Sequence, residues 1–286
     1  MPKSRKEVAV MKEESKKIEL LNPKSDYVFK RIFGHVGNEK ITCNLLNAIL
    51  ENKITKVELD KNPILEKDLL DDKIGILDIK AKADNNTNIN IEMQMIDRKN
   101  IEKRLLYYWS KMYIQGIKEA EDYEKLEKSI VILFSNYNLD NLKEIGKYIT
   151  QWNIREKENK HVVLTNTFEI YIIELKKYQG KTKNKELDRW VTFLQNPEVI
   201  EMSEENKELK KAKEVLEEIS QDEHERYLAE LRQKYIMDQK AIAGAGYDKG
   251  IQDEKQNIAK KLKEKGMSIG EIEEITGLVK EEIEKI

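Results

Sequence analysis

Two acidic residues in neighbouring segments have the types and spacing of a metal site. Residues 74–82 and 89–95 alternate apolar and polar side chains, which is the period-two pattern of a β-strand, and the turn-forming cluster 84–88 separates them. An antiparallel hairpin brings Asp78 and Glu92 together on one face. Two close carboxylates repel each other unless a cation lies between them, and hard oxygen ligands favour Mg²⁺ or Mn²⁺. The pattern therefore predicts a divalent-metal site.

The same faces carry Lys80, beside Asp78, and Gln94, beside Glu92. The alternative interpretation is an exposed hairpin face, on which acidic residues are ordinary. The flanking apolar residues make both strands central in a sheet, and central strands rarely carry charge without a functional reason. On the pattern alone the exposed face remains the favoured interpretation, and the resemblance to a nuclease family that these residues carry reverses this preference.

An Asp followed by a strand with Glu-x-Gln resembles the PD-(D/E)XK nuclease superfamily. Closer still is its transposase-like branch, the recombination-promoting nuclease (Rpn) family. The resemblance runs from about residue 20 to residue 195. Further segments carry it in the same order: 22–34 (NPKSDYVFKRIFG), 104–113 (RLLYYWSKMY), 172–175 (IIEL) and 189–194 (RWVTFL).

The resemblance implies an α/β fold, or α+β by a looser convention, with a small mixed sheet flanked by helices. It also implies a metal-dependent DNA endonuclease that uses Mg²⁺, Mn²⁺ or Ca²⁺. Asp78, Glu92 and the backbone carbonyl of Met93 would bind the metal. The superfamily usually has Lys at the third motif position, whereas this chain has Gln94, as the Rpn-like branch commonly does. An amide cannot carry the charge of Lys, but it can hydrogen-bond water or phosphate.

Three further side chains are candidates for accessory roles. Asp26 is either an ordinary helix-start residue, favoured by the positive end of the helix, or an extra support for the metal site. Lys30, one turn later, would pair with Asp26 or face phosphate. Lys80 would supply the cation that Gln94 lacks.

The helix predicted over residues 98–118 carries two stripes at helical spacing, one apolar and one polar. Arg104, Tyr108 and Lys111 of the polar stripe are candidates for binding DNA phosphates. For Tyr108 a core position is the favoured interpretation, because aromatic residues at helical spacing more often pack inside a protein.

The composition constrains the class of protein and its location. The chain has 286 residues, of which 39% are hydrophobic and 37% charged, and its net charge is only −2. DNA-binding proteins are often visibly basic, so DNA contacts must rely on local clusters of cations. The apolar runs are too short to span a bilayer, no signal peptide is evident, and Cys43 stands alone. We therefore expect a cytoplasmic protein with no membrane partner.

The composition predicts a flexible tail (1–20) and a helical C-terminal region (201–286), and the resemblance implies that residues 21–200 between them form a nuclease-like domain. Helices are expected over 138–148 and beyond residue 203, with a break near Gly244 and Gly246, and a strand over 162–165. The last segment resembles a helix-turn-helix, but its final helix is too acidic to enter a major groove. We therefore favour oligomerisation through the C-terminal helices. His35, His161 and His224 lack metal-ligand spacing and are interpreted as structural or solvated.

The sequence thus favours a metal-dependent endonuclease acting on DNA, and the resemblance to the Rpn-like branch implies roles in recombination, mobile-element biology or defence against phage. The alternative from another class is a non-catalytic DNA-binding or assembly protein that retains the fold, supported by the near-neutral charge and the missing Lys. A nuclease acting on RNA or modified DNA is a second alternative that the sequence does not separate from the first.

Overall fold

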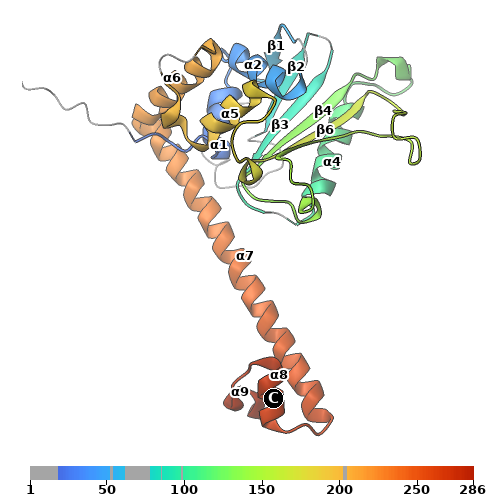
Figure 1. Ribbon diagram of the computed structural model, residues 1–286, viewed down its shortest axis with the longest axis vertical. Coiled ribbons are helices and arrows are strands. Elements are labelled where there is room, and N and C mark those ends of the chain that lie inside the picture. Colours follow the sequence, from blue (N-terminus) through green and yellow to red (C-terminus); the bar gives the residue numbers. More distant parts are fainter. Residues whose placement is uncertain (1–18, 52–53, 62–77, 85, 98, 202–204) are drawn as a thin grey trace, which may run out of the picture. The chain divides into compact units, whose positions relative to one another are not determined.

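A computed structural model describes residues 19–51, 54–61, 78–84, 86–97, 99–201 and 205–286 (Figure 1). Contacts between Cα atoms divide the chain into two units, Met1–Ala229 and Glu230–Ile286. The division falls about thirty residues beyond the composition change near residue 200, because the helix that follows this change packs against the first unit. Most of the predicted N-terminal tail, and residues 74–77 of the first predicted strand, lie outside the described residues.

The first unit is built on a six-stranded mixed sheet with the strand order β1-β2-β3-β4-β6-β5. The strands β1, β2 and β3 form an antiparallel meander, β3, β4 and β6 are parallel, and β5 is antiparallel at the far edge. This arrangement confirms the expected α/β class with a mixed sheet. The strands are β1 (Val57–Leu59), β2 (Ile79–Ala83), β3 (Asn88–Gln94), β4 (Ser129–Ser135), β5 (Ile149–Trp152) and β6 (Phe168–Glu174).

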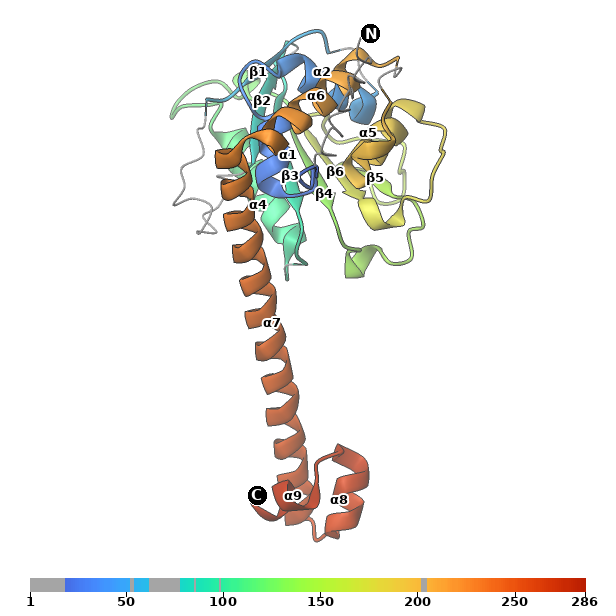
Figure 2. The same ribbon diagram turned by 90° about the vertical axis from the view of Figure 1, so that its left-hand side faces the viewer.

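One face of the sheet is covered by α1, α2 and α5, with α6 packed outside them (Figures 1 and 2). Aromatic contacts hold this layer: the ring centroids of Phe29 and Phe134 lie 5.4 Å apart, and those of Phe33 and Trp190 lie 5.5 Å apart. All four rings are fully buried, so they form the main core of the unit. The helices are α1 (Asp26–Phe33), α2 (Glu39–Leu50), α5 (Lys185–Gln195) and α6 (Lys207–Gln221).

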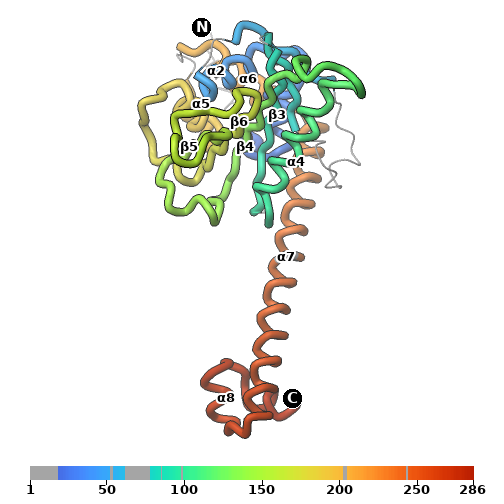
Figure 3. The backbone as a smooth tube through the Cα atoms, turned by 90° about the vertical axis from the view of Figure 1, so that its right-hand side faces the viewer, coloured from blue at the N-terminus to red at the C-terminus, as the bar shows by residue number. Residues whose placement is uncertain are grey.

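The opposite face is covered by α4 (Ile101–Ile114), which lies against β3 and β4 (Figure 3). The apolar stripe of α4 packs on Val131, Leu133, Ile170 and Ile172, which project from β4 and β6. The apolar and polar stripes predicted from the sequence are therefore both present on this helix. Its apolar side comprises Ile101, Leu105, Trp109 and Met112.

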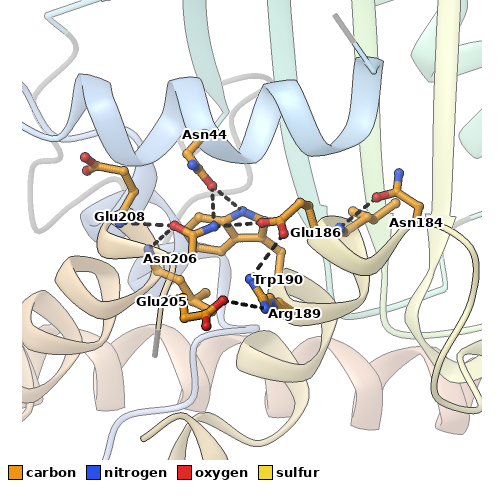
Figure 4. Close-up of polar contacts among 10 residues, drawn as sticks. Asn44, Asn184, Glu186, Arg189, Trp190, Glu205, Asn206 and Glu208 are labelled. Atoms are coloured by element: carbon orange, nitrogen blue, oxygen red, sulfur yellow. Dashed lines mark hydrogen bonds and ion pairs between the residues drawn. The ribbon is translucent and has the colours of Figure 1, made fainter. Parts of the chain in front are cut away.

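Helix α6 belongs to the first unit through a polar network that joins it to α2 and α5 (Figure 4). The side chain of Asn44 accepts hydrogen bonds from the Trp190 indole (3.0 Å) and from the Asn206 amide (2.9 Å). Asn206 also caps the first turn of α6, because its Oδ1 accepts from the backbone N–H groups of Glu208 and Leu209. Buried Leu209 and Leu216 complete the packing.

Three secondary-structure expectations were wrong. Residues 138–148 contain only the 3₁₀ turn η2 (Asp140–Leu142), because Leu139 and Leu142 are drawn into the core beneath α4. Residues 162–165 form a single bridge, Arg155 with Val163, instead of a strand. No break occurs at Gly244 and Gly246, since α7 is continuous over Glu223–Glu264 and the interruption lies before it, at Asp222. Short 3₁₀ turns also occur at η1 (Tyr123–Lys125), η3 (Leu175–Lys177) and η4 (Pro197–Val199).

The second unit comprises the remainder of α7 with α8 (Ile269–Thr276) and α9 (Lys280–Glu284). Ala259, Ile272, Leu278 and Ile283 form its small apolar core. The predicted capping box is present at Ser268 and Glu271 and sets the start of α8. None of the helices in the described ranges combines the length and apolar character needed to cross a bilayer.

Candidate active site

The register of the first hairpin places Asp78 opposite Glu92. Ile79 pairs with Ile91 and Lys80 with Asn90, so the next position toward the N-terminus of β2 faces Glu92. Residues directly opposite each other on antiparallel strands share a face, which is here the face covered by α4. The two carboxylates predicted from alternation are therefore brought together.

Glu92 is 1% exposed and is held by two neighbours. Its Oε1 lies 2.9 Å from Nη2 of Arg104, and the same oxygen accepts a short hydrogen bond from the Gln94 amide. Gln94 is half-buried and stands two residues further along β3, on the same face. The third position of the motif therefore contacts the second directly.

Asp78 is 8% exposed, and its burial raises the pKa of the carboxyl to about 6. The nearby positive charges of Arg104, Lys30 and Lys80, together with the Asn90 side chain, offset part of this rise. When burial makes a carboxyl group costly to ionise, a bound cation stabilises its ionised form strongly. Asp78 thus has the electrostatic character expected of a metal ligand.

Helix α4 brings a guanidinium and a phenol to the two carboxylates. Nε of Arg104 donates a 2.8 Å hydrogen bond to the hydroxyl of Tyr108, and the guanidinium lies 5.1 Å from the centroid of that ring. Burial alone would lower the pKa of the Arg104 guanidinium, but Glu92, Tyr108 and Asp78 together outweigh it and raise this pKa. Burial also raises the pKa of Tyr108, so the phenol stays protonated. Tyr108 is 7% exposed, as the core interpretation predicts, and its hydroxyl is the acceptor for Arg104.

An open cavity of about 520 Å³, the Asp78 cavity, lies between this sheet face and α4. Asp78 and Asn90 form part of its floor, and Tyr108 forms part of its wall. Lys80 and Lys111 line it from the sheet and the helix respectively, and both are exposed. The structure therefore gathers Asp78, Lys80, Tyr108 and Lys111 around one space. The cavity is also lined by Asp60, Lys82, Asn88, Met112, Gln115 and Glu127.

The donor set fits a magnesium-like ion. Within the described ranges no cluster of three or more His, Cys, Asp or Glu side chains is placed to hold a metal. Asp78 and Glu92 instead offer two carboxylates on opposite strand positions. Mg²⁺ is usually held by one or two carboxylates while it keeps several waters, so this sparse set matches its preference. Met93 lies between Glu92 and Gln94 with its side chain buried on the other face.

Of the predicted accessory residues, Lys30 acts on Asp78, whereas Asp26 has a contact at the start of its own helix. Lys30 is only 5% exposed, and its charge acts on Asp78 from α1. Asp26 is the first residue of α1, and its carboxylate accepts from the N–H of Tyr27 at 2.9 Å, as the helix-start interpretation predicts. Sequence analysis missed Asn90, which faces Asp78. Its position in the alternation, two residues before Glu92, was the available signal.

A family model described as a PD-(D/E)XK nuclease family transposase matches residues 23–245. The chain therefore belongs to this family, and the resemblance seen in the sequence is confirmed. Searches of curated proteins and of solved structures found no match. Members of this superfamily generally use divalent metal ions, which agrees with the character of the Asp78 and Glu92 pair.

Proposed function

We propose that this protein is a Mg²⁺-dependent endonuclease that hydrolyses phosphodiester bonds in DNA. The observation that carries the proposal is the placement of Asp78 opposite Glu92, with Asp78 lining an open cavity together with Lys80 and Lys111. Asp78, Glu92 and the Met93 carbonyl are the proposed metal ligands. When bound, the metal would lower the pKa of a water molecule and neutralise charge on the scissile phosphate.

The remaining roles follow from the contacts of each side chain. Gln94 already donates to Glu92, and its amide has the capacity to orient the attacking water as well. Arg104 holds Glu92 in place and carries a fixed positive charge toward the phosphate. Lys80 and Lys111 stand on either side of the Asp78 cavity, where they would contact the DNA backbone. Membership in a transposase family supports a role in mobile-element biology or recombination.

The direct test is nicking of a supercoiled plasmid by purified protein in Mg²⁺, Mn²⁺, Ca²⁺ or EDTA. We expect cleavage in Mg²⁺ and Mn²⁺ and none in EDTA. The Asp78→Asn variant is the matched control for a contaminating nuclease. Metal binding without cleavage of any DNA or RNA substrate would favour the non-catalytic alternative instead.

We further propose that the second unit mediates homo-oligomerisation. Helix α7 exposes several large apolar side chains that have no core to cover them: Met237, Ile242, Tyr247, Ile251 and Ile258. Tyr247, Ile251 and Ile258 follow each other at spacings of four and seven residues, so they share one side of the helix. Side chains of this kind suit a helix-to-helix contact with a second copy.

Light scattering on two truncations would test this role. Removal of 230–286 should lower the oligomer mass and leave the first unit folded, because the first unit keeps its own core. Removal of 203–286 should instead unfold the protein, since it strips away buried Leu209 and Leu216 of α6. An unchanged mass after the shorter truncation, together with weaker DNA binding, would favour a DNA-binding role for this unit.

A further inference from the structure

A second cavity in the first unit has the chemistry of a phosphate site and no assigned role. This histidine cavity has a volume of about 530 Å³. Four separate segments contribute nitrogen donors to it: Lys30 from α1, His35 after α1, Lys61 after β1 and His224 from α7. Its remaining lining comprises Tyr27, Arg31, Gly34, Val36, Asp60, Glu225 and Leu228.

The acidic residues of the histidine cavity do not cancel its positive character. Glu225 is engaged by Arg31, whose Nε and Nη2 lie 2.9 and 2.6 Å from its two oxygens. The hydroxyl of Tyr27 donates to the same carboxylate at 2.7 Å. The described lining carries three cationic side chains (Lys30, Arg31 and Lys61) and two carboxylates (Asp60 and Glu225). These described residues are therefore net positive even with both imidazoles neutral, and a neutral imidazole still offers one N–H donor.

The histidine cavity adjoins the proposed active site. Asp60 lines both cavities, and Lys30 lines the histidine cavity while its charge acts on Asp78. A nucleic-acid strand that presents one phosphate at Asp78 must carry its flanking phosphates away in both directions. Lys61 and the two histidines are exposed, so their side chains are accessible to a ligand from solvent.

We infer that the histidine cavity binds a phosphate group of the nucleic-acid strand, next to the phosphate that is cleaved. The strand assignment rests on the proposed nuclease function, whereas the phosphate site itself does not. His35, Lys61 and His224 would be its main contacts, with Lys30 behind them. Charge-assisted hydrogen bonds from lysine and imidazole donors to phosphate oxygens would supply the affinity.

The chain contains three histidines, which provides an internal control. His35 and His224 line the cavity, whereas His161 is an exposed residue beyond β5. The imidazole C–H signals of the full-length protein, labelled at histidine, would be followed by NMR during titration with inorganic phosphate in EDTA. We expect saturable shifts of the His35 and His224 signals and none for His161. Parallel movement of all three signals, or no movement, would overturn the site.

Two lysine variants sharpen the test. Lys61→Ala should weaken phosphate binding about five- to tenfold, as expected for the loss of one charge-assisted hydrogen bond. Lys183→Ala is the matched control, because Lys183 is an exposed lysine that lines a different cavity of the same unit. Equal affinities for the two variants would remove Lys61 from the site and contradict the proposal.

A second arm identifies the source of the phosphate. A short single-stranded oligonucleotide, titrated into the Asp78→Asn variant in Ca²⁺, should move the His35 and His224 signals and compete with inorganic phosphate. If phosphate binds but the oligonucleotide does not displace it, the strand assignment is wrong. If both bind while the wild-type protein fails to nick plasmid, the proposed function fails and the phosphate site stands.

Discussion

Helix α4 covers two halves of one sheet face that differ sharply in character. Over β4 and β6 the face is apolar, and residues such as Val131 and Leu133 are fully buried against the helix. Over β2 and β3 the same face carries Asp78, Asn90 and Glu92, and a cavity opens above it. The apolar half carries no polar site residues, so its packing fixes the position of α4 on the sheet. This packing in turn holds Arg104 and Tyr108 in place over the polar half.

A closer comparison concerns two buried glutamates on this face. Glu174 at the end of β6 is fully buried, accepts from the N–H of Leu139 at 2.8 Å and pairs with Lys177 at 2.6 Å. Lys177 in turn donates to two backbone carbonyl groups, so this ion pair is part of the scaffold. Glu92 lies instead beside a second carboxylate, that of Asp78, whose pKa burial raises. Both glutamates are ion-paired, but only Glu92 has a second carboxylate opposite it, and this difference supports its proposed role as a metal ligand.

The largest effect that would test this comparison is on cleavage. Asp78→Asn and Glu92→Gln should each lower the plasmid-nicking rate by more than about 100-fold, because outer-shell partners alone cost up to that amount and a ligand should cost more. Glu174→Gln should retain cleavage but lose about 3–5 kcal/mol of stability, since it leaves Lys177 as a buried charge without its partner. Nicking assays and thermal melts on the three proteins make the measurement.

Two results would contradict the proposed difference between Glu92 and Glu174. Wild-type cleavage by either Asp78→Asn or Glu92→Gln would show that the assigned carboxylates are not ligands. A Glu174→Gln protein that is fully folded yet inactive would move the chemistry toward β6.

The second effect concerns the third position of the motif. Gln94→Leu should lower the cleavage rate about 10- to 100-fold, because it removes the amide that contacts Glu92 and would orient water. Gln94→Lys restores the residue usual in the superfamily and should keep part of the activity. Cleavage by the Leu variant at the wild-type rate would exclude Gln94 from the mechanism.

Alternation and turn chemistry were sufficient to predict the hairpin and the meeting of Asp78 with Glu92, because a period of two fixes the face of every residue. The helical stripes likewise predicted which side of α4 meets the core. The role of α6 was not predictable in the same way. Its Lys- and Glu-rich exterior suggested a separate region, whereas the contact of Asn206 with Asn44 joins residues 162 positions apart and leaves no local signal. The histidine cavity was missed for the same reason, since His35 and His224 meet only in the fold.

The third effect is on the stability of the folded protein. Asp78→Asn should raise this stability, whereas Glu174→Gln should lower it. The folded protein holds the proton of Asp78 up to about pH 6, whereas an ordinary Asp releases it near pH 3.8. The folded state therefore binds more protons in this window, and stability falls as the pH rises through it. Asp78→Asn removes that penalty and should stabilise the metal-free protein at pH 7 by on the order of 2–3 kcal/mol.

Thermal melts in EDTA at several pH values would measure this gain, which should vanish near pH 4. Excess Mg²⁺ should reverse the order of the two proteins, because a ligand that binds only the folded wild type stabilises it alone. A gain that is independent of pH would mean that Asp78 is ionised without cost in the folded state.

The smallest effect separates Arg104 and Lys111, the two cations of α4 that are proposed to bind phosphate. Lys111 is exposed at the Asp78 cavity, whereas Arg104 is 23% exposed and already engaged with Glu92 and Tyr108. With a net charge of only −2, the proposed DNA binding would depend on a few local cations, so removing one phosphate-binding cation should reduce the salt dependence by about one unit. Lys111→Ala should show this reduction at an unchanged melting temperature, whereas Arg104→Ala should also lower the melting temperature because it breaks the buried ion pair.

Lys82→Ala is the control within the same cavity, since Glu127 lies 2.8 Å from its ammonium group and already neutralises it. The measurement is the slope of log affinity against log salt in Ca²⁺, and an equal reduction of slope for Lys82→Ala and Lys111→Ala would mean that DNA meets the whole sheet face instead of the path between β2 and α4.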